Sequence, residues 1–202
     1  MVRRPLAVGG DRRAGPRGGL HRGCPVSGGL SPADLEAVTA QLSRPARGVV
    51  GVAHRCPCGL PDVVETAPRL DDGTPFPTTY YLTCPRACAA VGTLESEGVM
   101  REMTTRLAED QQLAAAHRAA HDDYLRRRAL LGDVPELAGV SAGGMPERVK
   151  CLHALVGHAL AAGPGTNLLG DEALVALPDW WAAGRCVPGT GGEATAPERE
   201  GR

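Results

Sequence analysis

Hydrophobic residues recur with two different periods along the chain, and the change of period predicts where strands give way to helices. Residues 49–55, 62–66 and 78–83 are short runs rich in β-branched and aromatic side chains, and turn-forming Gly, Pro and Asp residues separate them. Runs of this length and composition are typical of strands joined by turns. The first half of the chain therefore predicts a small antiparallel sheet of about three strands.

The remaining hydrophobic residues follow the spacing of about 3.6 residues that marks helices. A first helix is expected after Ser31, a suitable N-cap followed by proline, and it should stop before Pro45. The order of elements predicts an α+β fold, in which the small sheet packs against a mostly helical C-terminal part. Helical patterns in that part cover residues 85–97, 98–131, 146–162 and 171–177.

Composition sets the limits of the folded part. Residues 1–29 and 188–202 are rich in Gly, Pro and charge without periodicity, so we expect a disordered arm and a disordered tail around one domain at 30–178. A net charge of -1 and few aromatic residues argue against nucleic acid as a partner. We expect a cytoplasmic protein, because we find neither a signal peptide nor the ~18 apolar residues of a membrane span.

Seven cysteines, an odd number, favour free thiols or metal ligands over a disulfide framework in a reducing compartment. Cys56 and Cys58 follow the first predicted strand, and Cys84 and Cys88 lie where the third strand meets a helix. Zinc takes four such ligands in tetrahedral geometry, although the first pair is one residue closer than the usual C-x-x-C knuckle. The alternative is that these small apolar thiols pack in the core.

Cys151, His153 and His158 follow one another closely in a predicted helix. At about 100° per residue, Cys151 and His153 diverge by roughly 160°, so a regular helix cannot use them as a self-contained metal site. We therefore expect thiols from elsewhere to complete the site, which gives Cys56, Cys84 and Cys151 as metal ligands. His153 is then either a catalytic residue or a hydrogen-bonded histidine of the core.

His117 and His121 are one helical turn apart in the long helical pattern, and this spacing places both imidazoles on the same face. Such a pair can share a metal ion or a substrate group, which makes His121 a candidate general base. The alternative is that this face is exposed and both imidazoles are solvated.

The glycine-rich segment SAGGMP at residues 141–146 precedes a predicted helix. Glycines ahead of a helix N-terminus free backbone N–H groups for an anion, and the helix dipole adds positive charge. We expect Gly143 and Gly144 to bind phosphate or a similar anion, with help from Arg148 and Lys150. The segment lacks the Gly-Lys-Ser/Thr ending of a nucleotide-binding P-loop, and the alternative is an ordinary glycine-rich connection.

Two longer stretches, RCPCGLPDVVETAPRLDDGTPFPTTYYLTCP and SAGGMPERVKCLHALVGHALAAGPGTNLLGDEAL, resemble a bacterial family, frequent in actinobacteria, known as domain of unknown function 501. The resemblance covers residues 49–177. It implies no activity, although genes of the family often lie near those for a septum-formation initiator and an exopolyphosphatase. Cys88 and His117 depart from the family pattern, whereas the matching positions include Arg55, Cys56, Cys84, His121, Lys150, Cys151, His153, Asn167 and Asp171.

These observations lead to two hypotheses of different class. The first is a Cys/His metal-binding domain, with zinc as the expected ion, beside an anion pocket; such a site would suit a small enzyme that acts on a phosphorylated small molecule or polyphosphate. The second is a non-catalytic interaction module with structural cysteines, whose partner is another protein and whose role is linked to cell division.

Overall fold

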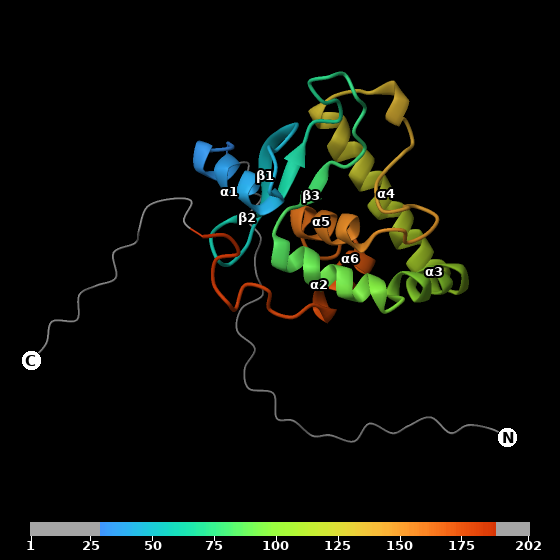
Figure 1. The fold of residues 1–202 in the computed structure, drawn as a ribbon. Coiled ribbons are helices and arrows are strands. Elements are labelled where there is room, and N and C mark those ends of the chain that lie inside the picture. Colours follow the sequence, from blue (N-terminus) through green and yellow to red (C-terminus); the bar gives the residue numbers. More distant parts are fainter. Residues whose placement is uncertain (1–28, 189–202) are drawn as a thin grey trace, which may run out of the picture.

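The computed structural model describes residues 29–188, so the expected arm and tail lie almost wholly outside the described residues. Within this range the chain forms a three-stranded antiparallel sheet and six α-helices, which confirms the predicted α+β fold (Figure 1). None of the described helices is long and apolar enough to cross a membrane. In chain order the elements are α1 (Pro32–Leu42), β1 (Val49–Arg55), β2 (Pro61–Thr66), β3 (Tyr80–Leu82), α2 (Pro85–Ser96), α3 (Val99–Glu109), α4 (Gln111–Leu131), the 3-10 turn η1 (Pro135–Leu137), α5 (Leu152–Ala162) and α6 (Leu168–Ala176).

The sheet has the order β1-β2-β3, and its middle strand is antiparallel to both neighbours. Val64 of β2 pairs with Val52 of β1 on one side and with Tyr81 of β3 on the other. The two outer strands run in the same direction. The residues that follow them, Cys56 and Cys84, therefore lie at the same end of the sheet.

Successive side chains of a strand point to opposite faces of the sheet. Different helices pack on the two faces of this sheet. On one face the ring of Tyr80 stacks on that of His158 in α5, with 5.7 Å between the ring centroids. The opposite face carries Val64 and Tyr81, and α1 covers only part of it (Figure 1). The sheet thus separates α1 from the main group of helices.

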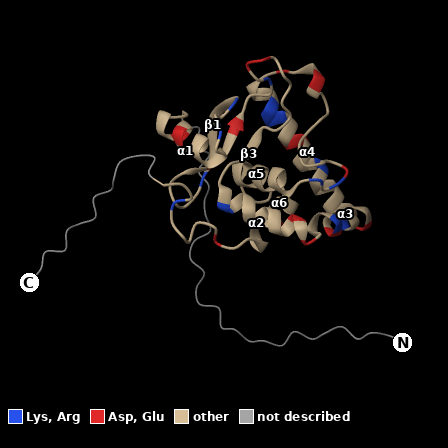
Figure 2. Cartoon of the chain, viewed as in Figure 1, with Lys and Arg blue, Asp and Glu red and all other residues tan. Residues whose placement is uncertain are grey.

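Helix α5 is the buried centre of that group. Its residues from Leu152 to Ala159 are nearly all buried, and it carries no Lys, Arg, Asp or Glu (Figure 2). A helix that is apolar on all sides has to be surrounded, and here the sheet, α2 and α6 surround it. Two glycines permit this close packing: a Cβ at Gly157 would lie 3.0 Å from the Tyr80 carbonyl oxygen, and one at Gly170 of α6 would lie 2.9 Å from the Cβ of Ala159.

Helix α1 begins where the sequence predicts. The Ser31 hydroxyl accepts a hydrogen bond from the backbone N–H of Asp34 at 3.1 Å, and the Asp34 carboxylate accepts in return from the Ser31 N–H at 3.2 Å. The same carboxylate holds both guanidinium nitrogens of Arg55, at 2.7 and 2.9 Å, at the end of β1. This bidentate pair ties α1 to the sheet and lowers the pKa of Asp34 to about 2.

The long helical pattern is divided at Asp110, a break that its periodicity does not reveal. The Asp110 carboxylate accepts hydrogen bonds from the backbone N–H groups of Gln112 and Leu113, at 2.9 and 3.0 Å. These bonds make Asp110 the N-cap of α4. The helical spacing of apolar residues continues across the break, so periodicity alone could not locate it.

The helix expected to open at Pro146 begins six residues later, at Leu152. The segment before it folds back on itself, with the Lys150 N–H donating to the Gly143 carbonyl at 2.7 Å and the Arg148 N–H donating to that of Gly144 at 3.2 Å. Both glycines have positive φ, +71° and +92°, and a Cβ at Gly144 would lie 2.8 Å from the Arg148 carbonyl oxygen. The two glycines therefore close a tight turn in front of the helix.

Candidate metal site

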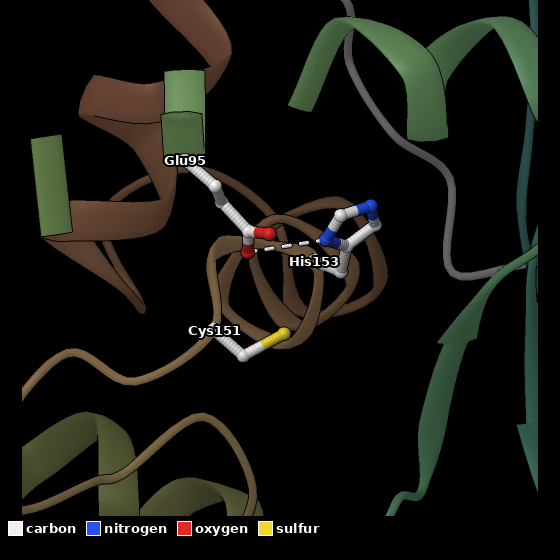
Figure 3. A group of neighbouring side chains, drawn as sticks. All are labelled: Glu95, Cys151 and His153. Carbon is white, nitrogen blue, oxygen red and sulfur yellow. Dashed lines mark hydrogen bonds and ion pairs between the residues drawn. The ribbon is translucent and has the colours of Figure 1, made fainter. Parts of the chain in front are cut away.

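Three side chains with metal-binding atoms converge at the N-terminus of α5. One ligand atom from each of Glu95, Cys151 and His153 lies within 4.8 Å of the other two, and no other group of three such residues is found among residues 29–188 (Figure 3). Glu95 comes from the last turn of α2, which packs against α5. Its Oε1 atom accepts from the backbone N–H of Leu152 at 2.7 Å, so the carboxylate satisfies a free donor of the helix end.

Cys151 and His153 meet because Cys151 is not part of the helix. Cys151 is the N-cap residue, with the extended backbone angles φ −154° and ψ 116°. The divergence of roughly 160° expected for a regular helix therefore does not apply to this pair. The prediction that the Cys151 and His153 side chains diverge is wrong, because it placed the start of α5 before Cys151.

The hydrogen bonds of His153 determine which ring nitrogen faces the other two residues. The Nε2 atom lies 3.2 Å from the Cys88 carbonyl oxygen, which can only accept, so Nε2 carries a proton. The Nδ1 atom lies 3.1 Å from Glu95 Oε1. Figure 3 shows the Cys151 sulfur and the Glu95 carboxylate on the same side of the ring, with Nε2 pointing away from both.

A nitrogen lone pair and a carboxylate oxygen at 3.1 Å repel each other unless a cation lies between them. Without a metal that cation is a proton. Contact with Cys151 and the ion pair with Glu95 raise the pKa of His153 to about 9, against the lowering effect of burial. The His153 imidazole is therefore protonated at neutral pH and pairs with the Glu95 carboxylate, and a metal ion can replace its proton.

The arrangement does not fit a nucleophilic Cys–His–Glu relay. In such a relay the thiol contacts one ring nitrogen and the carboxylate orients the other. In this site the second nitrogen of His153 is bound to a backbone carbonyl, and both Cys151 and Glu95 lie beside the first (Figure 3). The three ligand atoms instead lie within 4.8 Å of one another, a spacing compatible with metal coordination.

The structure does not bring Cys56, Cys84 and Cys151 within 4.8 Å of one another, and Cys151 lies with Glu95 and His153. Cys56 and Cys84 are both buried at one end of the sheet. Burial, with smaller contributions from the neighbouring thiols of Cys58 and Cys186 respectively, raises the pKa of each to about 12. Their surroundings agree with the alternative that these thiols pack in the core.

His117 and His121 lie on one face of α4, as the spacing predicts, but the alternative of a solvated face is wrong because both are buried. His121 Nδ1 lies 3.0 Å from the Ser141 hydroxyl, and His117 Nε2 lies 3.4 Å from the Arg148 carbonyl oxygen. Both imidazoles thus contact the turn before α5. Neither belongs to the metal-binding group.

The expected anion site has a different geometry from the one the sequence suggests. Gly143 and Gly144 do not lie directly before a helix, and the helix end that follows is already neutralised by the carboxylate of Glu95. Arg148 and Lys150 are exposed on the segment that leads into the helix. The glycines therefore shape the turn, and the anion at the helix N-terminus comes from the protein itself.

Glu95 is the member of this group that the sequence did not reveal. It lies 56 residues before Cys151 and is the single acidic residue of α2. Only the packing of α2 on α5 selects it. No local signal in the sequence could have found it.

A separate polar network is buried around His158 of α5. Asn167, the N-cap of α6, accepts from the Gly170 N–H at 3.0 Å, which fixes its amide so that Nδ2 donates to His158 Nδ1 at 3.3 Å. His158 Nε2 then donates to Asp123 at 3.0 Å. Burial lowers the pKa of His158, so the imidazole is neutral and each nitrogen has one role.

Comparison with known proteins adds one finding. Residues 52–175 match the model of a family described as Protein of unknown function (DUF501). No curated protein and no solved structure matches the chain. Because the match spans more than half of the 202 residues, the chain belongs to the DUF501 family.

Proposed function

We propose that this protein binds a divalent transition metal ion, zinc foremost, through Glu95, Cys151 and His153. The observation that supports the proposal is the convergence of a thiol, an imidazole nitrogen and a carboxylate within 4.8 Å. Bonds of about 2.0–2.1 Å in tetrahedral geometry separate nitrogen and oxygen ligands by roughly 3.3 Å. The Nδ1–Oε1 distance of 3.1 Å is close to that value.

The types of ligand favour zinc over the harder cations. Magnesium and calcium prefer oxygen ligands, whereas a thiolate and an imidazole suit zinc and its neighbours in the transition series. The surrounding contacts support the same role. The Cys88 carbonyl holds the imidazole in the tautomer that presents Nδ1, and the Leu152 N–H orients the carboxylate.

Three protein ligands leave a fourth position for water or a substrate atom, as in catalytic zinc sites. A bound metal there would lower the pKa of a water molecule or polarise a phosphoryl oxygen. The exposed Arg148 and Lys150, on the segment that leads into Cys151, support a phosphorylated small molecule or polyphosphate as the substrate class. Hydrolysis of p-nitrophenyl phosphate by the zinc-loaded protein tests this extension, and equal activity of wild type and Cys151→Ser would contradict it.

Metal binding itself is tested with full-length protein purified without a histidine tag. Elemental analysis should find close to one equivalent of zinc after loading and desalting, and competition with a chromophoric chelator gives the affinity. Cys151→Ser, His153→Gln and Glu95→Gln should each weaken zinc binding by at least about 100-fold. Less than about a tenth of an equivalent in wild type would refute the proposal.

The matched control is Cys58→Ser, which removes a thiol that lies outside the proposed site. This variant should retain the wild-type zinc affinity. If Cys58→Ser loses zinc and Cys151→Ser keeps it, the metal is held by the thiols at the end of the sheet and the proposed site is wrong.

A further inference from the structure

A hollow of about 240 Å³ opens on the face of the sheet that α1 covers only in part. Its floor is formed by Val64 and Thr66 of β2 and by Tyr81 of β3. These residues lie on the side of the sheet away from α5, since Tyr80 of the same strand stacks on His158. The sheet therefore lies between the hollow and α5, which carries the proposed metal site, and the hollow forms a second site.

The walls of the hollow are apolar and partly aromatic. Leu42 from the end of α1 forms one side, and Leu70 and Phe76 from the β2–β3 connection form the other. Phe76 and Tyr81 lie with their ring centroids 6.5 Å apart. They are two of only six aromatic residues in the chain, so a large share of its aromatic surface lines this one hollow.

Two guanidinium groups add positive charge to the apolar lining. Arg47 forms an ion pair with Asp72, which neutralises part of its charge. Arg44 is exposed, and among residues 29–188 it has no acidic partner within ion-pair distance. An apolar cavity with an unpaired arginine is complementary to an apolar molecule that carries a negative charge.

We propose that this hollow binds a small apolar anion, a molecule with an aromatic or branched apolar body and one carboxylate or phosphate group. The body would lie on Val64 and against the exposed sides of the Phe76 and Tyr81 rings, and Arg44 would pair with the anionic group. The volume is about eight times that of a water molecule in the liquid, which corresponds to a ligand of roughly ten non-hydrogen atoms. The site is independent of the metal proposal.

The test uses phenylacetate and phenyl phosphate as probes, with 2-phenylethanol as the uncharged analogue. Titration of ¹⁵N-labelled full-length protein should give saturable amide shifts at Val49, Thr66, Phe76 and Tyr81, with dissociation constants near 1 mM for probes of this size. Binding of either anion supports the site, and the preferred one identifies the anionic group. No saturable shift of these amides by either anion at about 10 mM would refute the proposal.

Variants separate charge recognition from nonspecific apolar binding. Arg44→Gln should weaken binding of the preferred anion about tenfold and change 2-phenylethanol binding less than about twofold. Arg118→Gln, which removes an exposed arginine of α4 outside the hollow, is the matched control and should change neither. Equal affinity of wild type for the charged and uncharged probes, or no effect of Arg44→Gln, would overturn the proposal.

Discussion

Replacing Asn167 by alanine tests whether the buried network around His158 holds α6 in place. Asn167 is fully buried and has two roles. Its oxygen caps α6 by accepting from the Gly170 N–H, and its Nδ2 donates to His158. Alanine removes both interactions and leaves His158 Nδ1 without a donor.

The two losses can be estimated separately. Loss of an N-cap side chain costs about 1 kcal/mol, and a buried acceptor left without a partner costs about 1–3 kcal/mol. The free energy of unfolding should therefore fall by about 2–4 kcal/mol, which corresponds to a decrease in Tm of roughly 6–12 °C for a domain of this size. The exposed cap at Asp110 provides the control, because Asp110→Ala removes a cap without a buried network and should cost only about 1 kcal/mol.

Urea unfolding followed by circular dichroism measures both variants. A loss below about 0.5 kcal/mol for Asn167→Ala, or a loss no larger than that of Asp110→Ala, would refute the account of the network. The isosteric Asn167→Asp adds a pH test. It keeps the cap acceptor but places a carboxylate beside His158 Nδ1.

The sign of the pH effect follows from the His158 pKa, which burial lowers in the folded protein. The unfolded chain then binds more protons than the folded one below about pH 6.5, so wild-type stability should fall as pH decreases from 7 to 5. In Asn167→Asp the new carboxylate favours the imidazolium. The stability of Asn167→Asp should therefore fall less than that of the wild type between pH 7 and 5. An equal or steeper fall would contradict the tautomer assigned to His158.

Three further predictions concern packing, charge and thiol reactivity. Gly170→Ala should cost about 1–3 kcal/mol in urea unfolding, because the new Cβ would collide with α5. The free energy of unfolding of the wild type should fall by about 1–2 kcal/mol as pH falls from 4 to 2, because Asp34, whose pKa is about 2 beside the partly exposed Arg55, becomes protonated. The free energy of unfolding of Arg55→Gln should fall less over the same range. Cys56 and Cys84 should resist iodoacetamide at pH 8, since a pKa of about 12 leaves only about one thiol in 10⁴ ionised, as mass spectrometry can show.

Each of these predictions has an outcome that contradicts it. If Gly170→Ala were as stable as the wild type, α6 would not lie as close to α5 as the structure places it. An identical acid transition in wild type and Arg55→Gln would remove the ion pair as its cause. Alkylation of Cys56 and Cys84 at the rate of an exposed thiol would show that the end of the sheet opens readily.

The sequence predicted those parts of the fold that local signals determine. The alternating β-branched runs placed the strands, with β1 at the predicted residues 49–55, and Ser31 with Asp34 placed the start of α1. These patterns act over a few residues and do not depend on the rest of the chain. The start of α5 was misplaced because Pro146 resembles a helix opening, whereas the turn closed by Gly143 and Gly144 extends to Cys151.

The candidate site was predicted only in part. Cys151 and His153 were chosen from the sequence as residues with suitable chemistry, and both lie in the metal-binding group. Their companion Glu95 comes from a contact between α2 and α5 that depends on tertiary packing. Cys56 and Cys84 were chosen for the same chemistry, but the end of the sheet buries them away from Cys151.

The zinc-edge X-ray absorption spectrum of the loaded protein tests the proposed metal centre most directly. One sulfur at about 2.3 Å and two or three nitrogen or oxygen atoms at about 2.0–2.1 Å are the expected ligands of a site built from Glu95, Cys151 and His153. The sulfur contribution should disappear in Cys151→Ser. A shell of three or four sulfurs, or a shell without sulfur in the wild type, would contradict the proposed site.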